Sequence, residues 1–129
     1  MDTIGNMLTI IRNGLAVKKE TVAIPYSQLK LNILKILEKR GFIKKSALKG
    51  RKNKKIIDVA LSYDKNKKPL ISHLKRISKP SRRIYISANK IRNVQSGKGI
   101  WVISTSKGVF DDKEAKKNKL GGELICEIW

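Results

Sequence analysis

The chain has 129 residues, which suffices for one compact domain or two very small ones and leaves no room for a third. Its 30 Lys and Arg against 10 Asp and Glu give a net charge of +20, more than solubility requires, and such a surface attracts polyanions. A single cysteine excludes an internal disulfide, and no apolar run approaches the roughly 20 residues that span a bilayer. We therefore expect an intracellular nucleic-acid-binding protein without a membrane partner; the alternative is a basic surface that serves solubility alone.

The first half of the chain is expected to form two helices and a hairpin. Apolar residues at helical spacing predict a helix in TIGNMLTIIRNGLA, with Gly14 at its fraying end. After the short VAIPY stretch, Ser27 can cap a second helix that ends near Arg40. The apolar stripe predicted for this helix comprises Leu29, Ile33, Ile36 and Leu37. The segments FIKKSAL and IIDVALSY predict paired strands, because in the second of them apolar and polar residues alternate.

The connection of this hairpin, KGRKNKK at residues 49–55, is basic at five of its seven positions. Such a segment is expected to be exposed, and it either stays in solvent or contacts phosphate. Phosphate contact is the favoured interpretation.

The second half of the chain is expected to be mostly β. A polar stretch, DKNKKP, separates residues 1–66 from residues 67–129. In RRIYIS the alternation predicts a strand with one basic and aromatic face, and IWVI predicts a buried strand that leads into STSKG at residues 104–108. A short helix capped by Asp111 or Asp112 is then expected to stop at Gly121–Gly122, before a final strand in ELICEIW.

Few residues are suited to catalysis. His73 has no cysteine or carboxylate cluster near it in sequence, and SGKG at residues 96–99 lacks the glycine and the Ser or Thr that a phosphate-binding loop requires around it. Capping and solvation explain Asp111, Asp112 and Glu114. We therefore expect no enzyme activity, no metal site, no cofactor and no small-molecule substrate.

The hydroxyl residues of STSKG leave two alternatives open. Each hydroxyl can donate and accept, so the loop could follow sugars, phosphates and base edges of an irregular RNA. Alternatively, the hydroxyls bond to the backbone of their own turn.

STSKG followed by EA, GGE and a final C-x-x-W resembles the signature of the ribosomal small-subunit protein eight family. MLTIIRNG, IPYSQLKLNILKILEKRGFI and LKRISKPSRRIY also resemble that family, so the similarity covers nearly the whole chain. The resemblance implies a mixed α/β (α+β) fold of two small subdomains, the first α-β-α-β-β and the second mostly β with one short helix. Departures are Asp111 and Lys116, where the family usually has threonine and arginine, and Glu127 in place of an aromatic residue.

The same resemblance implies a structural constituent of the small ribosomal subunit. Such a protein binds the central domain of 16S-type rRNA, helps to assemble the platform of the 30S subunit and contacts ribosomal proteins five and twelve. It would work in cytoplasmic ribosomes or in those of an organelle. The alternatives are a non-ribosomal regulator or chaperone that binds RNA or DNA, and an enzyme that uses STSKG.

The resemblance also implies the residues that contact RNA. Ser104, Thr105 and Ser106 would make the central contact, Tyr85 would stack on a base or ribose, and Glu123 would accept from base amino groups. For Glu123 the alternative is an ion pair with a lysine of the short helix. Phosphate contacts are expected from Lys30, Arg76, Lys79, Arg82 and Arg83. The other expected members of the contact set are Lys107, Gly121, Gly122, Thr3, Arg12 and Asn13.

Overall fold

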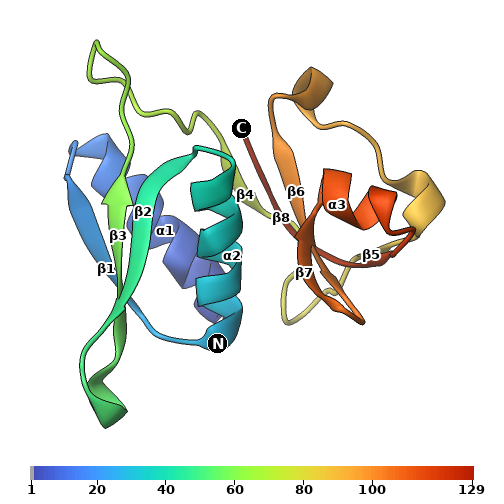
Figure 1. Cartoon of the computed structure of the whole chain (residues 1–129), viewed down its shortest axis with the longest axis horizontal. Coiled ribbons are helices and arrows are strands. Elements are labelled where there is room, and N and C mark those ends of the chain that lie inside the picture. The colour runs from blue at the N-terminus through green and yellow to red at the C-terminus, as the bar shows by residue number, and fades with distance from the viewer. Residues whose placement is uncertain (1) are drawn as a thin grey trace. The chain divides into compact units, whose positions relative to one another are not determined.

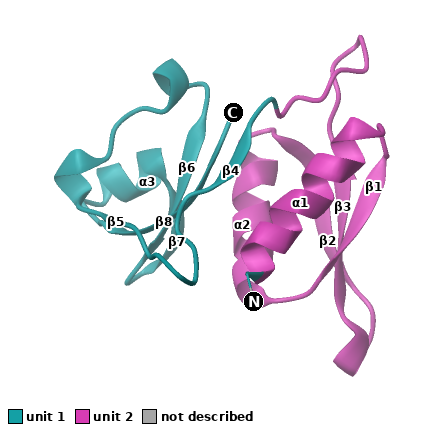
Figure 2. Ribbon diagram, turned by 180° about the vertical axis from the view of Figure 1, so that it is seen from behind, with its two compact units in different colours: residues 1–2, 72–129 teal, residues 3–71 magenta. Residues whose placement is uncertain are grey.

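The computed structural model describes residues 2–129, which form two compact units (Figures 1 and 2). Unit 1 comprises Asp2 and residues 72–129, and unit 2 comprises residues 3–71. Within the described residues there are three α-helices and two antiparallel sheets, so the predicted mixed α/β class is confirmed. None of these helices is long and apolar enough to cross a membrane.

Unit 2 has the predicted α-β-α-β-β order. Its sheet is antiparallel with strand order β1-β3-β2. The bounds are α1 Thr3–Ala16, β1 Thr21–Pro25, α2 Gln28–Lys39, β2 Ile43–Lys49 and β3 Ile56–Leu61, with a 3-10 turn at Lys52–Lys54. The side chains of β3 alternate as predicted, and Ile57, Val59 and Leu61 are buried.

Two details of unit 2 differ from the sequence-based expectation. Helix α1 continues past Gly14 to Ala16, and a Cβ at position 14 would lie 2.6 Å from Cγ1 of Val22. Gly14 is therefore required for close packing of α1 on β1 and does not end the helix. In α2, which Ser27 caps as predicted, Leu29 is 39% exposed and lies outside the buried stripe.

Unit 1 is a sheet covered by one short helix. Its strand order is β4-β8-β6-β7, and β5 also pairs with β8. The bounds are β4 Leu74–Arg76, β5 Tyr85–Ile86, β6 Ile100–Thr105, β7 Gly108–Asp111, α3 Asp112–Lys117 and β8 Gly122–Ile128, with 3-10 turns at Ala88–Lys90 and Gln95–Gly97. Ala115 of α3 packs with the buried Ile91, Ile103 and Leu124, which form the core on one face of this sheet.

Strand β7 and the true end of α3 were not predicted. The chain turns back at Ser106 and Lys107, within STSKG, and pairs with β6 through Gly108–Asp111 before the helix begins. Asp111 is the cap, because its carboxylate accepts from the N–H of Glu114 at 2.8 Å. The helix ends at Lys117 and not at Gly121–Gly122 as expected. Two residues later, Lys119 has a left-handed φ of 55°.

The end of β8 is fastened to the residues before β4. The backbone N–H of Trp129 donates to the carbonyl of His73 and the N–H of His73 donates to that of Trp129, while the two rings stack 3.8 Å apart. Glu127 Oε2 lies 3.0 Å from Nε2 of the same histidine. Glu127, which departs from the family pattern, thus orients His73 beneath Trp129. Cys126 is buried as expected, and burial raises the pKa of its thiol to about 12.

Candidate nucleic-acid interface

Three of the expected RNA-contacting residues lie side by side on the sheet of unit 1. Glu123 of β8 pairs with Tyr85 of β5 on one side and with Ser104 of β6 on the other. Directly opposed residues in an antiparallel sheet point to the same face. We call Tyr85, Glu123 and Ser104 the cross-strand row. Its neighbours Leu124 and Ile103 point to the opposite face, into the core beneath α3, so the row faces away from that core.

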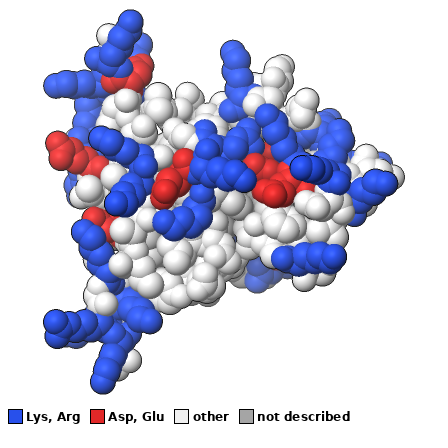
Figure 3. Space-filling view, viewed as in Figure 1, with Lys and Arg blue, Asp and Glu red and all other residues white. Residues whose placement is uncertain are grey.

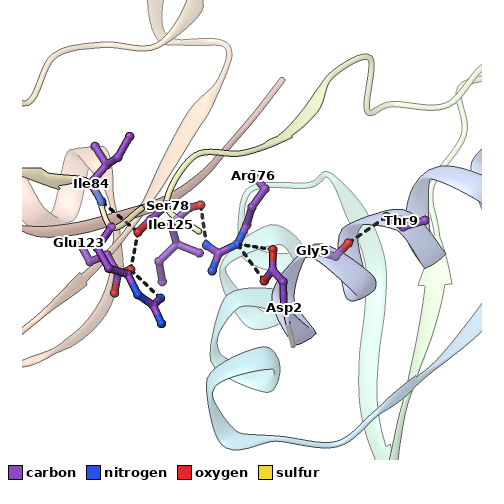
Figure 4. Close-up of polar contacts among 9 residues, drawn as sticks. Asp2, Gly5, Thr9, Arg76, Ser78, Ile84, Glu123 and Ile125 are labelled. Carbon is purple, nitrogen blue, oxygen red and sulfur yellow. Dashed lines mark hydrogen bonds and ion pairs between the residues drawn. The ribbon is translucent and has the colours of Figure 1, made fainter. Parts of the chain in front are cut away.

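Glu123 is held in place by two donors. The hydroxyl of Ser78 donates to Oε2 at 2.5 Å, and Nη1 of Arg83 donates to the same oxygen at 3.0 Å (Figure 4 shows the first contact). Burial alone would raise the pKa of this carboxyl, but the bonds from Ser78 and Arg83, with the charges of Arg83 and Arg76, hold the pKa below its usual value. The expected alternative partner, a lysine of α3, is wrong, and one oxygen of Glu123 makes no hydrogen bond within residues 2–129.

The lowered pKa of Glu123 predicts a pH dependence of stability. A carboxyl whose pKa is lower in the folded chain stabilises it fully above its unfolded value of about 4.3, and this contribution is lost as pH falls through the folded value. We therefore expect Glu123→Gln to reduce the loss of unfolding free energy between pH 6 and pH 3, measured by urea denaturation. The exposed Glu20, changed to Gln, is the control. Equal pH profiles for both variants would contradict this role of Glu123.

Ser78 was not predicted, although it joins two segments of the site. Its side chain is fully buried, and its hydroxyl accepts from the N–H of Ile84 at 3.1 Å while donating to Glu123. No local pattern marks this serine, because its partners lie 6 and 45 residues away in sequence.

Gly121 and Gly122 were expected to contact RNA, and the structure gives both a steric role. A Cβ at position 122 would lie 2.0 Å from the carbonyl oxygen of Ser104, and one at position 121 would lie 2.5 Å from that of Ile86. Both obstacles are backbone atoms, which cannot move without separating the strands. The two glycines therefore allow β8 to approach β5 and β6 closely enough to form the cross-strand row.

The hydroxyls of STSKG are not equivalent. Ser104 and Thr105 end β6, so the turn itself consists of Ser106 and Lys107, both exposed. The hydroxyl of Thr105 donates to the carbonyl of Gly108 at 2.8 Å and accepts from the N–H of Lys107 at 3.1 Å. The hydroxyls of Ser104 and Ser106 make no hydrogen bond with any described residue. The hydroxyl of Thr105 therefore stabilises its own turn, whereas those of Ser104 and Ser106 are available to an external partner.

A tight basic turn lies close to the row in sequence. Lys79 and Arg82 exchange backbone hydrogen bonds of 3.0 and 2.9 Å around Pro80 and Ser81, and all four residues are exposed. Arg83 follows and reaches Glu123. Lys79, Arg82 and Arg83, three of the residues expected to contact phosphate, thus lie in the segment that leads directly into β5.

Two other expected phosphate contacts are engaged or buried. The Nε of Arg76 donates to Asp2 at 3.3 Å and its Nη1 to the carbonyl of Ile125 at 2.8 Å, and the side chain is 11% exposed (Figure 4). Lys30 is 6% exposed, and burial lowers the pKa of its ammonium. Neither side chain therefore extends freely into solvent, as a phosphate contact would require. Thr3, Arg12 and Asn13 are exposed on α1 of unit 2.

Among the charged side chains visible in Figure 3, the basic ones prevail, and the few carboxylates lie among them. Within residues 2–129 no group of three or more His, Cys, Asp or Glu side chains is placed to hold a metal ion.

Comparison with known proteins gives one consistent result. A family model described as ribosomal protein S8 matches residues 2–129. The chain is 44% identical over 128 residues to small ribosomal subunit protein uS8 of Anaeromyxobacter sp. (strain K), which covers 99% of this chain and 97% of that protein. It is 45% identical to the protein of that name from Thermodesulfovibrio yellowstonii and 47% identical to that from Kosmotoga olearia, with 99% of this chain and 98% of each relative covered.

Proposed function

Because the chain belongs to the ribosomal protein S8 family, we propose that it binds the central domain of small-subunit rRNA through unit 1 and helps to assemble the platform of the 30S subunit. The family makes the chain a structural, non-enzymatic constituent of the small ribosomal subunit. The proposed protein neighbours are small-subunit proteins five and twelve, and this part rests on the family resemblance alone.

The cross-strand row is the observation that supports RNA recognition best. An exposed aromatic ring, a carboxylate and a hydroxyl lie in register on three strands, where they can stack, accept and donate on unpaired bases. The carboxylate is the informative member, because an anion weakens phosphate binding. Its free oxygen can accept from the amino group of a base, which gives the site selectivity that the net charge of +20 cannot provide.

The surrounding charges position the RNA. Lys79, Arg82 and Lys107 are exposed in the two turns beside the row, and such side chains contact phosphates without distinguishing sequences. Attraction and selectivity therefore come from different residues of the same unit.

A salt titration tests the proposal. Binding to a central-domain rRNA fragment with an irregular helix is measured between 50 and 300 mM salt, against duplex RNA and duplex DNA of equal length. We expect affinity for the fragment to exceed that for either duplex at every salt concentration, because base contacts persist when counterion effects weaken. Equal affinities that fall together would show that binding is electrostatic only, as in the alternative of a general nucleic-acid chaperone.

Substitution of single hydroxyls separates recognition from turn formation. We expect Ser106→Ala to weaken binding of the rRNA fragment by about 1 kcal/mol with an unchanged melting temperature, since its hydroxyl has no partner in the described chain. We expect Thr105→Val to destabilise the protein by about 1 kcal/mol, because it removes both hydrogen bonds of the turn. Titration and thermal denaturation of both variants measure this, and a less stable Ser106→Ala with unchanged affinity would contradict the assignment.

A further inference from the structure

The connection between β2 and β3 concentrates positive charge at one end of unit 2. We call residues 49–55 the β2–β3 tip. Its five cations are Lys49, Arg51, Lys52, Lys54 and Lys55, and every residue of the tip is exposed. Figure 1 shows the tip projecting from the hairpin at the lower left, and a dense group of basic side chains lies at the same place in Figure 3. No apolar side chain lies within the tip, and the exposed Leu48 and Ile56 flank it at the ends of β2 and β3.

The tip is a fixed turn. The N–H of Lys54 donates to the carbonyl of Arg51 at 2.8 Å, and residues 52–54 form one turn of 3-10 helix. Gly50 has a φ of 98°, and a Cβ there would lie 2.2 Å from the carbonyl oxygen of Lys54. Lys52 also has a left-handed φ, 43°, which is unfavourable for a residue with a side chain. The turn therefore sets the backbone positions from which its cations project.

Most of the charge on the tip has no local counterpart. Lys49 pairs with Asp58 at 3.1 Å, and Nζ of Lys55 lies 5.6 Å from the centre of the Tyr26 ring. Arg51, Lys52 and Lys54 form no ion pair with residues 2–129. Three cations within four residues of a tight turn repel one another, and an anionic partner would reduce this repulsion.

We propose that the β2–β3 tip is a second RNA contact, which holds the sugar-phosphate backbone of an rRNA segment through Arg51, Lys52 and Lys54 while unit 1 binds its own segment. This proposal rests on the proposed function for the identity of the RNA. Lysine and arginine side chains without neighbouring aromatic or carboxylate groups suit phosphates and select no sequence. The tip adds affinity by linking a second contact to the first, and it contributes nothing to discrimination.

A charge-matched pair of triple variants tests the contact. The tip variant carries Arg51→Ala, Lys52→Ala and Lys54→Ala, and the control carries Lys65→Ala, Lys67→Ala and Lys68→Ala in the exposed loop that follows β3. Each removes three charges from unit 2, and each set includes one lysine with a left-handed φ. On central-domain rRNA, log K falls as log salt rises. We expect this fall to become less steep by about two units in the tip variant, at 0.7 to 0.9 per lost phosphate contact, and by less than one unit in the control. Equal slopes for the two variants would overturn the proposal.

A tethered cleavage reagent identifies the RNA segment that the tip touches. Asn53→Cys places a thiol on the tip, and Asn66→Cys places one in the control loop; Cys126 is fully buried, so only the new thiol takes an iron chelate. We expect hydroxyl radicals from position 53 to cut one short rRNA segment and those from position 66 to cut none comparably. Absent or equal cleavage from position 53 would overturn the proposal.

The outcomes separate the two proposals. If the β2–β3 tip does not contact RNA, both triple variants give the same salt slope, while the protein still prefers the irregular helix. If the proposed function is wrong, that preference is lost, and the tip variant still lowers the salt slope on any RNA. Retained binding and slope for the tip variant would point to an acidic protein as the partner of the tip, which also contradicts the proposal.

Discussion

Gly122→Ala is expected to lower the free energy of unfolding of unit 1 by about 3 kcal/mol, although it adds a single methyl group. The new Cβ would lie 2.0 Å from the oxygen and 2.8 Å from the carbon of the Ser104 carbonyl, so β8 must move away from β6. Forced overpacking of this kind typically costs 1–3 kcal/mol, and here the obstacle is backbone. Urea denaturation followed by circular dichroism measures the loss.

Gly97→Ala is the control for this substitution. Position 97 has a φ of 90°, and a Cβ there would meet nothing within 4 Å, so only conformational strain of about 1 kcal/mol is expected. The same shift of β8 would separate Glu123 from Ser104, and Gly122→Ala should therefore also weaken rRNA binding without removing an atom that touches RNA. A variant that keeps wild-type stability and affinity would show that β6 and β8 tolerate a wider spacing.

Tyr85→Ala is expected to weaken binding of the central-domain rRNA fragment by about 2 kcal/mol and to reduce the preference for that fragment over duplex RNA. Loss of base stacking on an aromatic ring costs roughly 1–3 kcal/mol. Tyr85 is 70% exposed, so its side chain contributes little to the core, and the melting temperature should not change. Parallel titrations on the fragment and the duplex measure both effects.

Tyr85→Phe distinguishes the ring from the hydroxyl. The variant keeps the stacking surface and should bind within about 0.5 kcal/mol of the original chain. Equal losses for Phe and Ala would assign the contact to the hydroxyl, and no loss for Ala would remove Tyr85 from the interface.

The regular part of the fold could be predicted because its signals are local. Helix α2 is marked by the Ser27 cap and by apolar residues such as Ile33 and Leu37 at helical spacing, and β3 by strict alternation. Strand β7 was missed because GVFD is short and lies directly before the strong cap and helix signal of DDKEAKK. The end of α3 was misplaced because a lysine at position 119 takes the left-handed conformation that glycine usually supplies.

For the candidate site, the sequence predicts which residues take part but not how they are arranged. The resemblance to the family predicts Tyr85, Glu123 and Ser104 as RNA contacts, whereas their alignment depends on strand pairing between residues up to 38 apart in sequence. The partners of Glu123 illustrate the limit, since Ser78 and Arg83 reach it from a different part of the chain. Burial of Lys30 could not be seen either, because a lysine in a helix looks the same in sequence whether it faces solvent or not.

Strand β8, which pairs with β4, β5 and β6, has a consequence for synthesis on the ribosome. All its partners precede it in the chain, so the sheet of unit 1 stays open until residues 122–128 have emerged from the exit tunnel. The helices and strands of unit 2 are complete by residue 61, about 60 residues earlier, and domains commonly fold as they emerge. The nascent chain therefore exposes the β2–β3 tip well before the cross-strand row exists, and its charge can meet RNA during translation.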